Sequence, residues 1–309
     1  MPAKSSFDVI TFTVEGRSGI SASTAEEVTE GLDLRGKNIL VTGVGSGLGE
    51  ESARVLAARG ARIFGAARSE EKAAEACRKL GGDAVPLACE LSEPASVRAC
   101  VANVRERGDQ LDVLLCNAGI MALPKRETRY GQELQFLTNH IGHFILVTGL
   151  LGQLADTGRV VMLSSSAHKG APRGGIQWDD LSMEKNYSPW GAYGQSKLAN
   201  LLFARALARR FAGTNKTANS LHPGVIATNL GRHMGSVANG LLHAASAVFL
   251  KSIPEGAATQ CYVATHPSLA AVTGEYFADC NVATSSRHGR DDAMAERLWT
   301  VTEEIVAKL

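Results

Sequence analysis

The chain has 309 residues, of which 45% are hydrophobic and 20% charged, which is typical of a globular protein that contains one large α/β domain or two small ones. Its 32 basic and 31 acidic residues give a net charge of +1, which argues against nucleic acid as a partner. No stretch approaches the roughly 20 apolar residues of a membrane span. The first twenty residues lack an apolar signal core, so we expect a cytoplasmic protein. Six cysteines without a Cys-x-x-Cys pair favour buried thiols.

The predicted elements begin with an N-terminal extension over residues 1–35, in which Ser23–Glu27 has capping-box spacing and predicts a short helix. From Lys37 onward, short apolar runs alternate with longer stretches of helical character. The runs cover 38–41, 62–66, 84–88, 111–116, 159–163 and 219–222, with a late one near 275–277. Continuous apolar runs fit strands buried on both faces of a parallel sheet. Residues 36–309 are therefore predicted to form a single doubly wound Rossmann domain, an α/β fold with about seven parallel strands.

The first predicted strand leads into the glycine-rich turn Thr42–Gly49, which reads TGVGSGLG and precedes a helix predicted over Glu50–Arg59. Glycines let the backbone approach a pyrophosphate, and a helix N-terminus offers free N–H groups. The spacing G-x3-G-x-G differs from the generic G-x-G-x-x-G, so a tight turn in some other α/β protein is the alternative. The cofactor contacts expected from this turn are Gly43, Ser46, Gly47, Leu48 and Gly49.

The end of the second predicted strand bears on which dinucleotide binds. An NAD site has an acidic residue about 20 residues past the turn, which accepts a hydrogen bond from the ribose 2′-OH. Here the strand ends Gly65-Ala66-Ala67-Arg68, without an acid. The Arg68 guanidinium suits a 2′-phosphate, and the alternative is a solvated side chain. In both cases the missing acid favours NADP(H).

Tyr193 and Lys197 are spaced i and i+4 in a long helical stretch, so their side chains share one helix face. Hydride transfer to a carbonyl needs a proton for the developing alkoxide. A free tyrosine has a pKa of about 10, and a nearby ammonium lowers that pKa towards neutrality. Lys197 is expected to do this and to bind the nicotinamide ribose. Chance alone produces many such pairs on surface helices.

Two strand ends contribute further polar groups. Ser164-Ser165-Ser166 follows the run that ends at Leu163, and Asn117-Ala118-Gly119 follows the run that ends at Cys116. The carboxyl ends of parallel strands share the ligand-binding edge of the sheet. A serine hydroxyl there can polarise a substrate oxygen.

Together these motifs resemble the short-chain dehydrogenase/reductase family over about residues 36–280. Thr42–Gly49 is similar to its TGxxxGxG turn, Cys116–Gly119 to its NNAG segment with cysteine in the first place, and Tyr193 and Lys197 to its YxxxK pair. The resemblance implies that Ser165 is the active-site serine, with Ser166 as the fallback. It also implies that Asn139 completes a tetrad and supports a proton relay through water. Tyr193 is also an implied cofactor contact. The further implied cofactor contacts are Glu90, where the family usually has Asp, with Leu91, Asn117, Ala118, Gly119, Pro223, Gly224, Val225 and Thr228.

Within the family, four segments resemble retinol-dehydrogenase-like and WW-domain-oxidoreductase-like members: 139–144 (NHIGHF), 164–168 (SSSAH), 193–200 (YGQSKLAN) and 221–233 (LHPGVIATNLGRH). Those relatives commonly use NADP(H), which agrees with Arg68. From this sequence we expect neither the N-terminal membrane anchor nor the WW domain of such relatives, so a retinoid does not follow as the substrate.

Two segments are candidates for the substrate pocket. Residues 229–257 carry apolar side chains at roughly helical spacing and are predicted to form a substrate lid, with a core face, a dimer face or a membrane-surface contact as alternatives. Residues 169–189 form either a pocket wall or plain surface packing. An apolar lid implies an apolar or bulky substrate.

Three other features favour ordinary structural roles. His140 and His143 are spaced i and i+3 but lack an accompanying ligand cluster, so helix packing is preferred over a metal pair and no metal is predicted. Cys116 is expected to be a buried strand residue rather than a redox-sensitive thiol. Asp179 and Asp180 are expected in a solvated loop.

The sequence therefore predicts an NADP(H)-dependent oxidoreductase that interconverts a small-molecule alcohol with a ketone or aldehyde. Tyr193 is the predicted general acid/base, Ser165 orients the substrate oxygen, and Lys197 and Asn139 support proton transfer. Two alternatives stay open: an NADP(H)-binding regulator or scaffold without turnover, and a reductase of carbon–carbon double bonds like the protochlorophyllide reductases. A homodimer or a homotetramer is compatible with the sequence.

Overall fold

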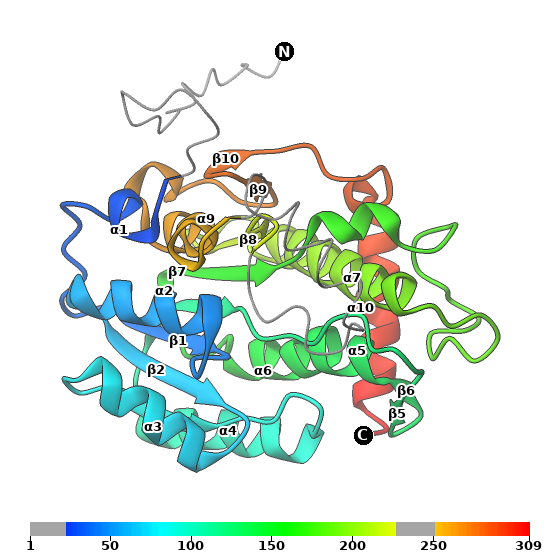
Figure 1. Cartoon of the computed structure of the whole chain (residues 1–309), viewed down its shortest axis with the longest axis horizontal. Helices are drawn as coiled ribbons and strands as arrows, with labels where there is room; N and C mark the ends of the chain where they lie inside the picture. Colours follow the sequence, from blue (N-terminus) through cyan, green and yellow to red (C-terminus); the bar gives the residue numbers. More distant parts are fainter. Residues whose placement is uncertain (1–22, 227–250) are drawn as a thin grey trace, which may run out of the picture.

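The computed structural model describes residues 23–226 and 251–309, and its middle layer is an eight-stranded sheet with helices on both faces (Figure 1). The strands are β1 (Asn38–Thr42), β2 (Arg62–Ala67), β3 (Val85–Ala88), β4 (Leu111–Cys116), β7 (Leu154–Leu163), β8 (Thr217–His222), β9 (Tyr276–Ala278) and β10 (Asn281–Val282). A separate two-stranded ribbon joins β5 (Thr128–Arg129) to β6 (Gln132–Glu133). The predicted α/β class with a parallel sheet is confirmed.

The strand order is β10-β9-β8-β7-β4-β1-β2-β3, and all neighbours are parallel except β9 and β10. From β1 the chain first adds β2 and β3 on one side, then crosses to β4 and continues on the other. The connections above β1 and β4 therefore diverge, and such a switch point is where open α/β sheets bind ligands.

The sheet holds eight strands rather than the predicted seven, because β10 forms a short hairpin with β9. Its turn consists of Asp279 and Cys280, which take φ values of +51° and +58°. Sequence patterns mark such turns by glycine or asparagine, and β10 has no apolar run, so neither signal was present.

Alternate residues of the strands face two apolar layers. Leu40 points into the layer beneath α4 (Pro94–Arg107), α6 (Gly142–Leu150), α7 (Pro189–Arg210) and α10 (Asp292–Val306). Ile39 and Val41 point into the layer beneath α1 (Ala25–Val28), α2 (Gly47–Ala58), α3 (Glu70–Leu80) and α9 (Ile253–Thr265). Burial on both faces explains why the strands are apolar throughout. The remaining short helices are α5 (Leu134–Phe136), η1 (Leu137–Ile141), η2 (Ser166–Gly170), η4 (Pro267–Leu269) and η5 (His288–Arg290).

The predicted N-terminal capping box is confirmed. The Thr24 side chain accepts from the backbone N–H of Glu27, and the Glu27 carboxylate accepts from the N–H of Thr24 at 2.7 Å. The resulting helix α1 buries Ala25 and Val28 in the same apolar layer as α2 and α9. This part of the expected extension therefore packs against α9 and α2.

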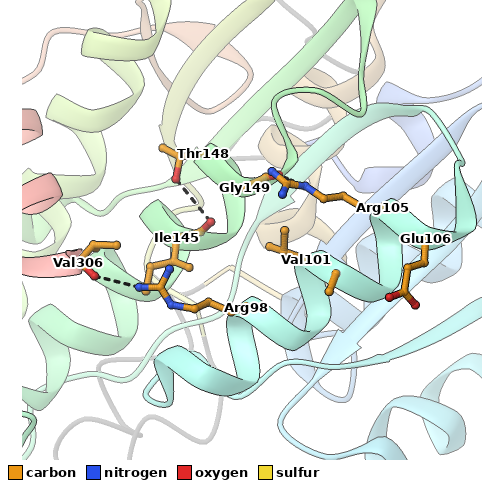
Figure 2. Close-up of a pocket in the computed structure, with 9 residues that line it drawn as sticks. Arg98, Val101, Arg105, Glu106, Ile145, Thr148, Gly149 and Val306 are labelled. Carbon is orange, nitrogen blue, oxygen red and sulfur yellow. Dashed lines mark hydrogen bonds between the residues drawn. The ribbon is translucent and has the colours of Figure 1, made fainter. Parts of the chain in front are cut away.

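A groove of about 550 Å³ lies between α4, α6 and the end of α10, where Arg98 donates to the carbonyl of Val306 at 2.9 Å and Arg105 donates to that of Gly149 (Figure 2). The two arginines thus cap the C-terminal ends of α10 and α6. In the described ranges, no helix is long and apolar enough to cross a membrane.

Candidate active site

The glycine turn after β1 brings helix α2 against the main chain of the turn. Gly43 has a φ of +76°, and its N–H donates to the carbonyl of Ala66 at 2.9 Å. A Cβ added at Gly49 would lie 2.2 Å from the carbonyl oxygen of Gly43 and 2.5 Å from Asn117 Nδ2. The helix can approach this closely only because residue 49 has no side chain.

Helix α2 begins at Gly47, three residues before the predicted start. Ser46 is its N-cap in extended conformation, and the serine side chain makes no capping hydrogen bond. The first N–H groups of the helix, which lack partners within the helix, are thus left to bind an anion. A residue of α9 also contacts this turn, because the Leu48 carbonyl accepts a hydrogen bond from Gln260 Nε2 at 3.0 Å.

The two residues predicted near the adenine ribose differ in their surroundings. Arg68 is exposed after β2, and within the described ranges its side chain has no ion-pair partner. The Glu90 carboxylate instead accepts from the N–H and the hydroxyl of Ser92, at 3.2 and 3.0 Å. Leu91 lies against α6, where a Cβ at Gly142 would come within 2.3 Å of the Leu91 carbonyl.

The segment after β4 is tied to the end of β1. The N–H groups of Asn117 and Ala118 donate to Thr42 Oγ1 at 2.9 and 3.0 Å, and Asn117 Nδ2 donates to the Thr42 carbonyl at 2.8 Å. A Cβ at Gly119 would lie 2.9 Å from Asn139 Oδ1 and 3.3 Å from Lys197 Nζ. Asn117–Gly119 therefore connects the glycine turn to the predicted catalytic residues.

Tyr193 and Lys197 share one face of α7, which begins at Pro189 after the N-cap Ser188. Lys197 Nζ lies 5.7 Å from the centre of the Tyr193 ring. The Ser165 side chain interacts with the Tyr193 side chain and favours its ionised form. The structure thus brings Tyr193, Lys197 and Ser165 together.

The other two serines differ from Ser165. Ser164 is buried, and its hydroxyl donates to the carbonyl of Lys197 at 2.7 Å, which anchors α7 to β7. Ser166 is exposed and begins η2. Of the three, Ser165 is the serine whose side chain interacts with Tyr193.

The pKa of Tyr193 departs from expectation. Burial raises it to about 12, and the interaction with the Ser165 side chain opposes that shift only in part. The spacing of the pair predicts that Lys197 lowers this pKa. The net shift is upward instead, because burial of the phenol outweighs the contacts that favour its ionised form. Lys197 Nζ donates to the Leu163 carbonyl at 2.9 Å, and burial lowers the pKa of Lys197 itself to about 8. An ammonium with that pKa is still mostly charged at neutral pH.

Asn139 lies in η1, a single turn of π-helix between α5 and α6. Its Oδ1 accepts from the Ile120 N–H at 2.8 Å, while its Nδ2 donates to the Ile120 carbonyl and to Ser196 Oγ, both at 2.9 Å. Ser196 Oγ in turn donates to the carbonyl of Tyr193 at 2.8 Å. Asn139 thus fixes the segment after Gly119 and the start of α7 relative to each other.

Pro223, Gly224 and Val225 follow β8 at the same edge. Gly224 has a φ of +100°, and a Cβ there would lie 2.6 Å from Lys251 Cδ. The N–H of Lys251 donates to the Val225 carbonyl at 2.8 Å. Thr228 and residues 229–250 of the predicted lid lie outside the described residues; 251–257 contains the start of α9.

Two aromatic side chains of the predicted loop at 169–189 contribute to packing. The Arg297 guanidinium lies over the Trp178 ring, 4.3 Å from the ring centre, and the Tyr187 hydroxyl donates to the Leu123 carbonyl at 2.6 Å. Trp190, just beyond the loop, is 54% exposed and lies edge-to-face with Tyr193, at 6.1 Å between ring centres. Trp190 therefore flanks the site.

Other polar and sulfur-containing residues of the described ranges have structural surroundings. The described residues contain no cluster of three or more His, Cys, Asp or Glu side chains that could hold a metal ion. Cys116 and the other five cysteines are buried free thiols, as predicted. Asp180 caps its own loop by accepting from the N–H groups of Glu184 and Lys185. Three residues that link the site were not predicted as site residues: Thr42, His143 and Ser196. Their partners lie on other elements, and no local motif marks them.

The chain has close relatives among known proteins. Residues 37–177 match the family "short chain dehydrogenase". Short-chain dehydrogenase TIC 32 A, chloroplastic, from Brassica napus is 44% identical over 95% of this chain and 96% of that relative. Retinol dehydrogenase 14 from Homo sapiens is 39% identical over 89% of this chain and 88% of its own length. The chain therefore belongs to the short-chain dehydrogenase/reductase family and is similar to its retinol dehydrogenase members.

Solved structures agree with this assignment. A protein from Mycobacterium paratuberculosis is 34% identical with a TM-score of 0.75, over 93% of this chain and 98% of that one. A blue fluorescent protein from a metagenomic library, solved in complex with NADPH, is 26% identical with a TM-score of 0.63, over 79% and 96%. Family membership supports an oxidoreductase that uses a nicotinamide cofactor and a small-molecule substrate.

Proposed function

We propose that the protein is an NADP(H)-dependent oxidoreductase that interconverts an alcohol with a ketone or aldehyde. The observation that carries the proposal is the grouping of Tyr193, Ser165 and Lys197 beside the segment that Thr42 ties to the glycine turn. A nicotinamide dinucleotide fits this edge, because Gly49 allows close approach of the main chain and the N-terminus of α2 offers free N–H groups.

In this proposal the nicotinamide supplies or accepts the hydride. Tyr193 donates its phenolic proton to the substrate oxygen as the carbonyl is reduced, and Ser165 donates a hydrogen bond to the same oxygen. With a pKa of about 12, the phenol holds its proton at neutral pH, which is the state that reduction requires. Alcohol oxidation requires the phenolate instead.

Lys197 has two further roles in the proposal. One N–H of its ammonium goes to the Leu163 carbonyl, which leaves two donors for the nicotinamide ribose. Its positive charge also stabilises the phenolate left on Tyr193 after proton transfer. Asn139 holds the segments on either side of this pair and supports the return of a proton through water.

The preference for NADP(H) rests on Arg68. The end of β2 carries Ala66 and Ala67, which cannot accept a hydrogen bond from a ribose 2′-OH through a side chain. The exposed guanidinium of Arg68 lies at the end of the same strand and is suited to a 2′-phosphate. The NADPH complex of the metagenomic relative is consistent with this choice.

Exposed apolar side chains around the site support the proposal of an apolar or bulky substrate. Trp190 and Val225, which are 54% and 55% exposed, are two of the large apolar side chains most exposed to solvent, and they flank Tyr193 and the segment after β8. Exposed apolar side chains beside a polar site mark a surface that binds an apolar ligand. The retinol dehydrogenase relatives agree in general character with such a substrate.

Substitution of Tyr193 by Phe tests the proposal. We expect kcat with NADPH to fall by about 10² to 10⁴, the usual contribution of a general acid, while the Kd for NADPH stays within about twofold. Near-native turnover of Tyr193→Phe would contradict the assignment. Tight NADPH binding by the wild type without turnover of any carbonyl would favour a regulator, and a saturated product from an enone would favour double-bond reduction.

A further inference from the structure

His143 lies at the centre of a buried hydrogen-bond network beneath the site. Its Nε2 is 2.9 Å from Thr42 Oγ1, and its Nδ1 is 2.8 Å from the main-chain oxygen of Asn139. Neither His143 nor Asn139 is accessible to solvent, and Thr42 is only 1% exposed. The imidazole thus joins Thr42, the last residue of β1, to the π-helical turn that carries Asn139.

The direction of these hydrogen bonds follows from the partners. A carbonyl oxygen only accepts, so His143 Nδ1 carries the proton and donates it to Asn139. Thr42 Oγ1 already accepts from the N–H groups of Asn117 and Ala118, so its own hydroxyl proton goes to His143 Nε2. Both ends require the same neutral tautomer. Burial and the charge of Lys197 lower the pKa of His143 to about 4, so the ring is neutral at physiological pH.

We infer that His143 is a positioning residue that sets the glycine turn and the catalytic segment in register. Through Thr42, His143 orients the hydroxyl oxygen that accepts from the chain after β4. Through the main-chain oxygen of Asn139, it fixes η1, and the Asn139 side chain in turn forms hydrogen bonds with Ile120 and Ser196. This inference rests on the proposed function, because it assigns His143 to the alignment of cofactor and proton donor.

His140, in the adjoining helix η1, provides a matched control. It is equally buried, and burial likewise lowers its pKa, to about 3. Its Nε2, however, is 3.0 Å from Thr302 Oγ1 on α10, on the side away from the glycine turn. A substitution at 140 therefore perturbs the adjoining helix and the same apolar layer without touching Thr42.

Two conservative substitutions separate the two hydrogen bonds of His143. In His143→Gln the side-chain oxygen takes the place of Nε2 and accepts from Thr42, while in His143→Asn the amide takes the place of Nδ1 and donates to Asn139. We expect His143→Asn to weaken NADPH binding about tenfold with a smaller loss of kcat, and His143→Gln to lower kcat about tenfold with a smaller loss of affinity. The measurements are the NADPH Kd from fluorescence titration, kcat, and Tm.

The controls are His140→Gln and His140→Asn, which we expect to lower Tm while NADPH Kd and kcat stay within about twofold. Thr42→Val tests the same bond from its other end, even if the variants at 143 do not fold. It also removes the hydrogen bonds from Asn117 and Ala118, so it should weaken NADPH binding at least as much as His143→Asn does, and adding His143→Asn to it should cost little more.

Three results would overturn the inference. The first is that substitutions at 143 and at 140 change the NADPH Kd and kcat equally. The second is that His143→Asn and His143→Gln lose NADPH affinity and kcat in the same ratio, and the third is that Thr42→Val leaves the NADPH Kd unchanged. Failure of the proposed function has a different signature, because the NADPH Kd requires no turnover. Wild-type protein that binds NADPH but reduces no carbonyl would refute the proposed function and leave the binding comparison intact.

Discussion

On the cofactor side of the site, at the ends of β1 and β4, most contacts involve main-chain groups and glycines, such as the close approach of Gly49 to the Gly43 carbonyl. On the substrate side, at the ends of β7 and β8, the groups are side chains, among them Ser165, Trp190 and Val225. Main-chain contacts tolerate few substitutions, whereas a rim of side chains can change without disturbing the fold. The comparison indicates that cofactor binding is built into the sheet and substrate choice is added to it.

The comparison predicts its largest effect for Gly49→Ala. The added Cβ would overlap the Gly43 carbonyl at 2.2 Å, so α2 must move away from the turn. We expect NADPH binding to weaken about a hundredfold, which corresponds to about 2.7 kcal/mol. Gly45→Ala is the matched control, because nothing lies within 4 Å of a Cβ there and its φ is not positive. Similar NADPH Kd values for the two variants would contradict a rigid cofactor side.

The pH dependence of the two reaction directions tests the role of Tyr193. Its pKa of about 12 means that the phenolate, the base for alcohol oxidation, becomes about tenfold more abundant with each pH unit. Oxidation should therefore rise from pH 6 to 8, while reduction stays level. Above the Lys197 pKa of about 8 the lysine loses its charge, so the rise should flatten and reduction should decline. An oxidation optimum near pH 7 in a plot of kcat/KM would contradict this prediction.

Arg68→Ala examines the cofactor side through a single charge. Loss of the guanidinium should weaken NADPH binding about tenfold and leave NADH binding nearly unchanged, since only NADPH carries the 2′-phosphate. Arg98→Ala is a suitable control, because Arg98 lies on α4 and its guanidinium caps the end of α10 through the Val306 carbonyl. Equal losses for NADPH and NADH in fluorescence titrations would show that Arg68 does not recognise the phosphate.

Trp190→Ala examines the substrate side and carries the smallest expected effect. We expect kcat/KM to fall about fivefold for a bulky apolar ketone and to stay level for a short aliphatic aldehyde, because only the larger molecule reaches the ring. Trp178→Ala serves as the control, since Trp178 packs under Arg297. Parallel losses on both substrates would indicate that Trp190 acts through Tyr193 rather than on the substrate.

The same division explains which features were predictable from the sequence. Topology puts the carboxyl ends of parallel strands at one edge, so the proximity of Thr42–Gly49, Asn117 and Ser165 followed from their order along the chain. The link from Thr42 to His143 joins residues 101 positions apart, and no local pattern encodes it. Nor could spacing give the sign of the Tyr193 pKa shift, which depends on burial. The hairpin at Asp279 and Cys280 was not predicted, because neither turn residue is a glycine.

The most direct measurement is the change in absorbance of the reduced cofactor when wild-type protein is given aromatic ketones, steroids, retinal and aliphatic aldehydes with NADPH or NADH. We predict turnover of at least one apolar carbonyl, with kcat/KM about tenfold or more higher for NADPH than for NADH. Preference for NADH would contradict the assignment of Arg68. Tight NADPH binding without turnover across the whole panel would contradict the central claim that Tyr193 acts as a proton donor in carbonyl reduction.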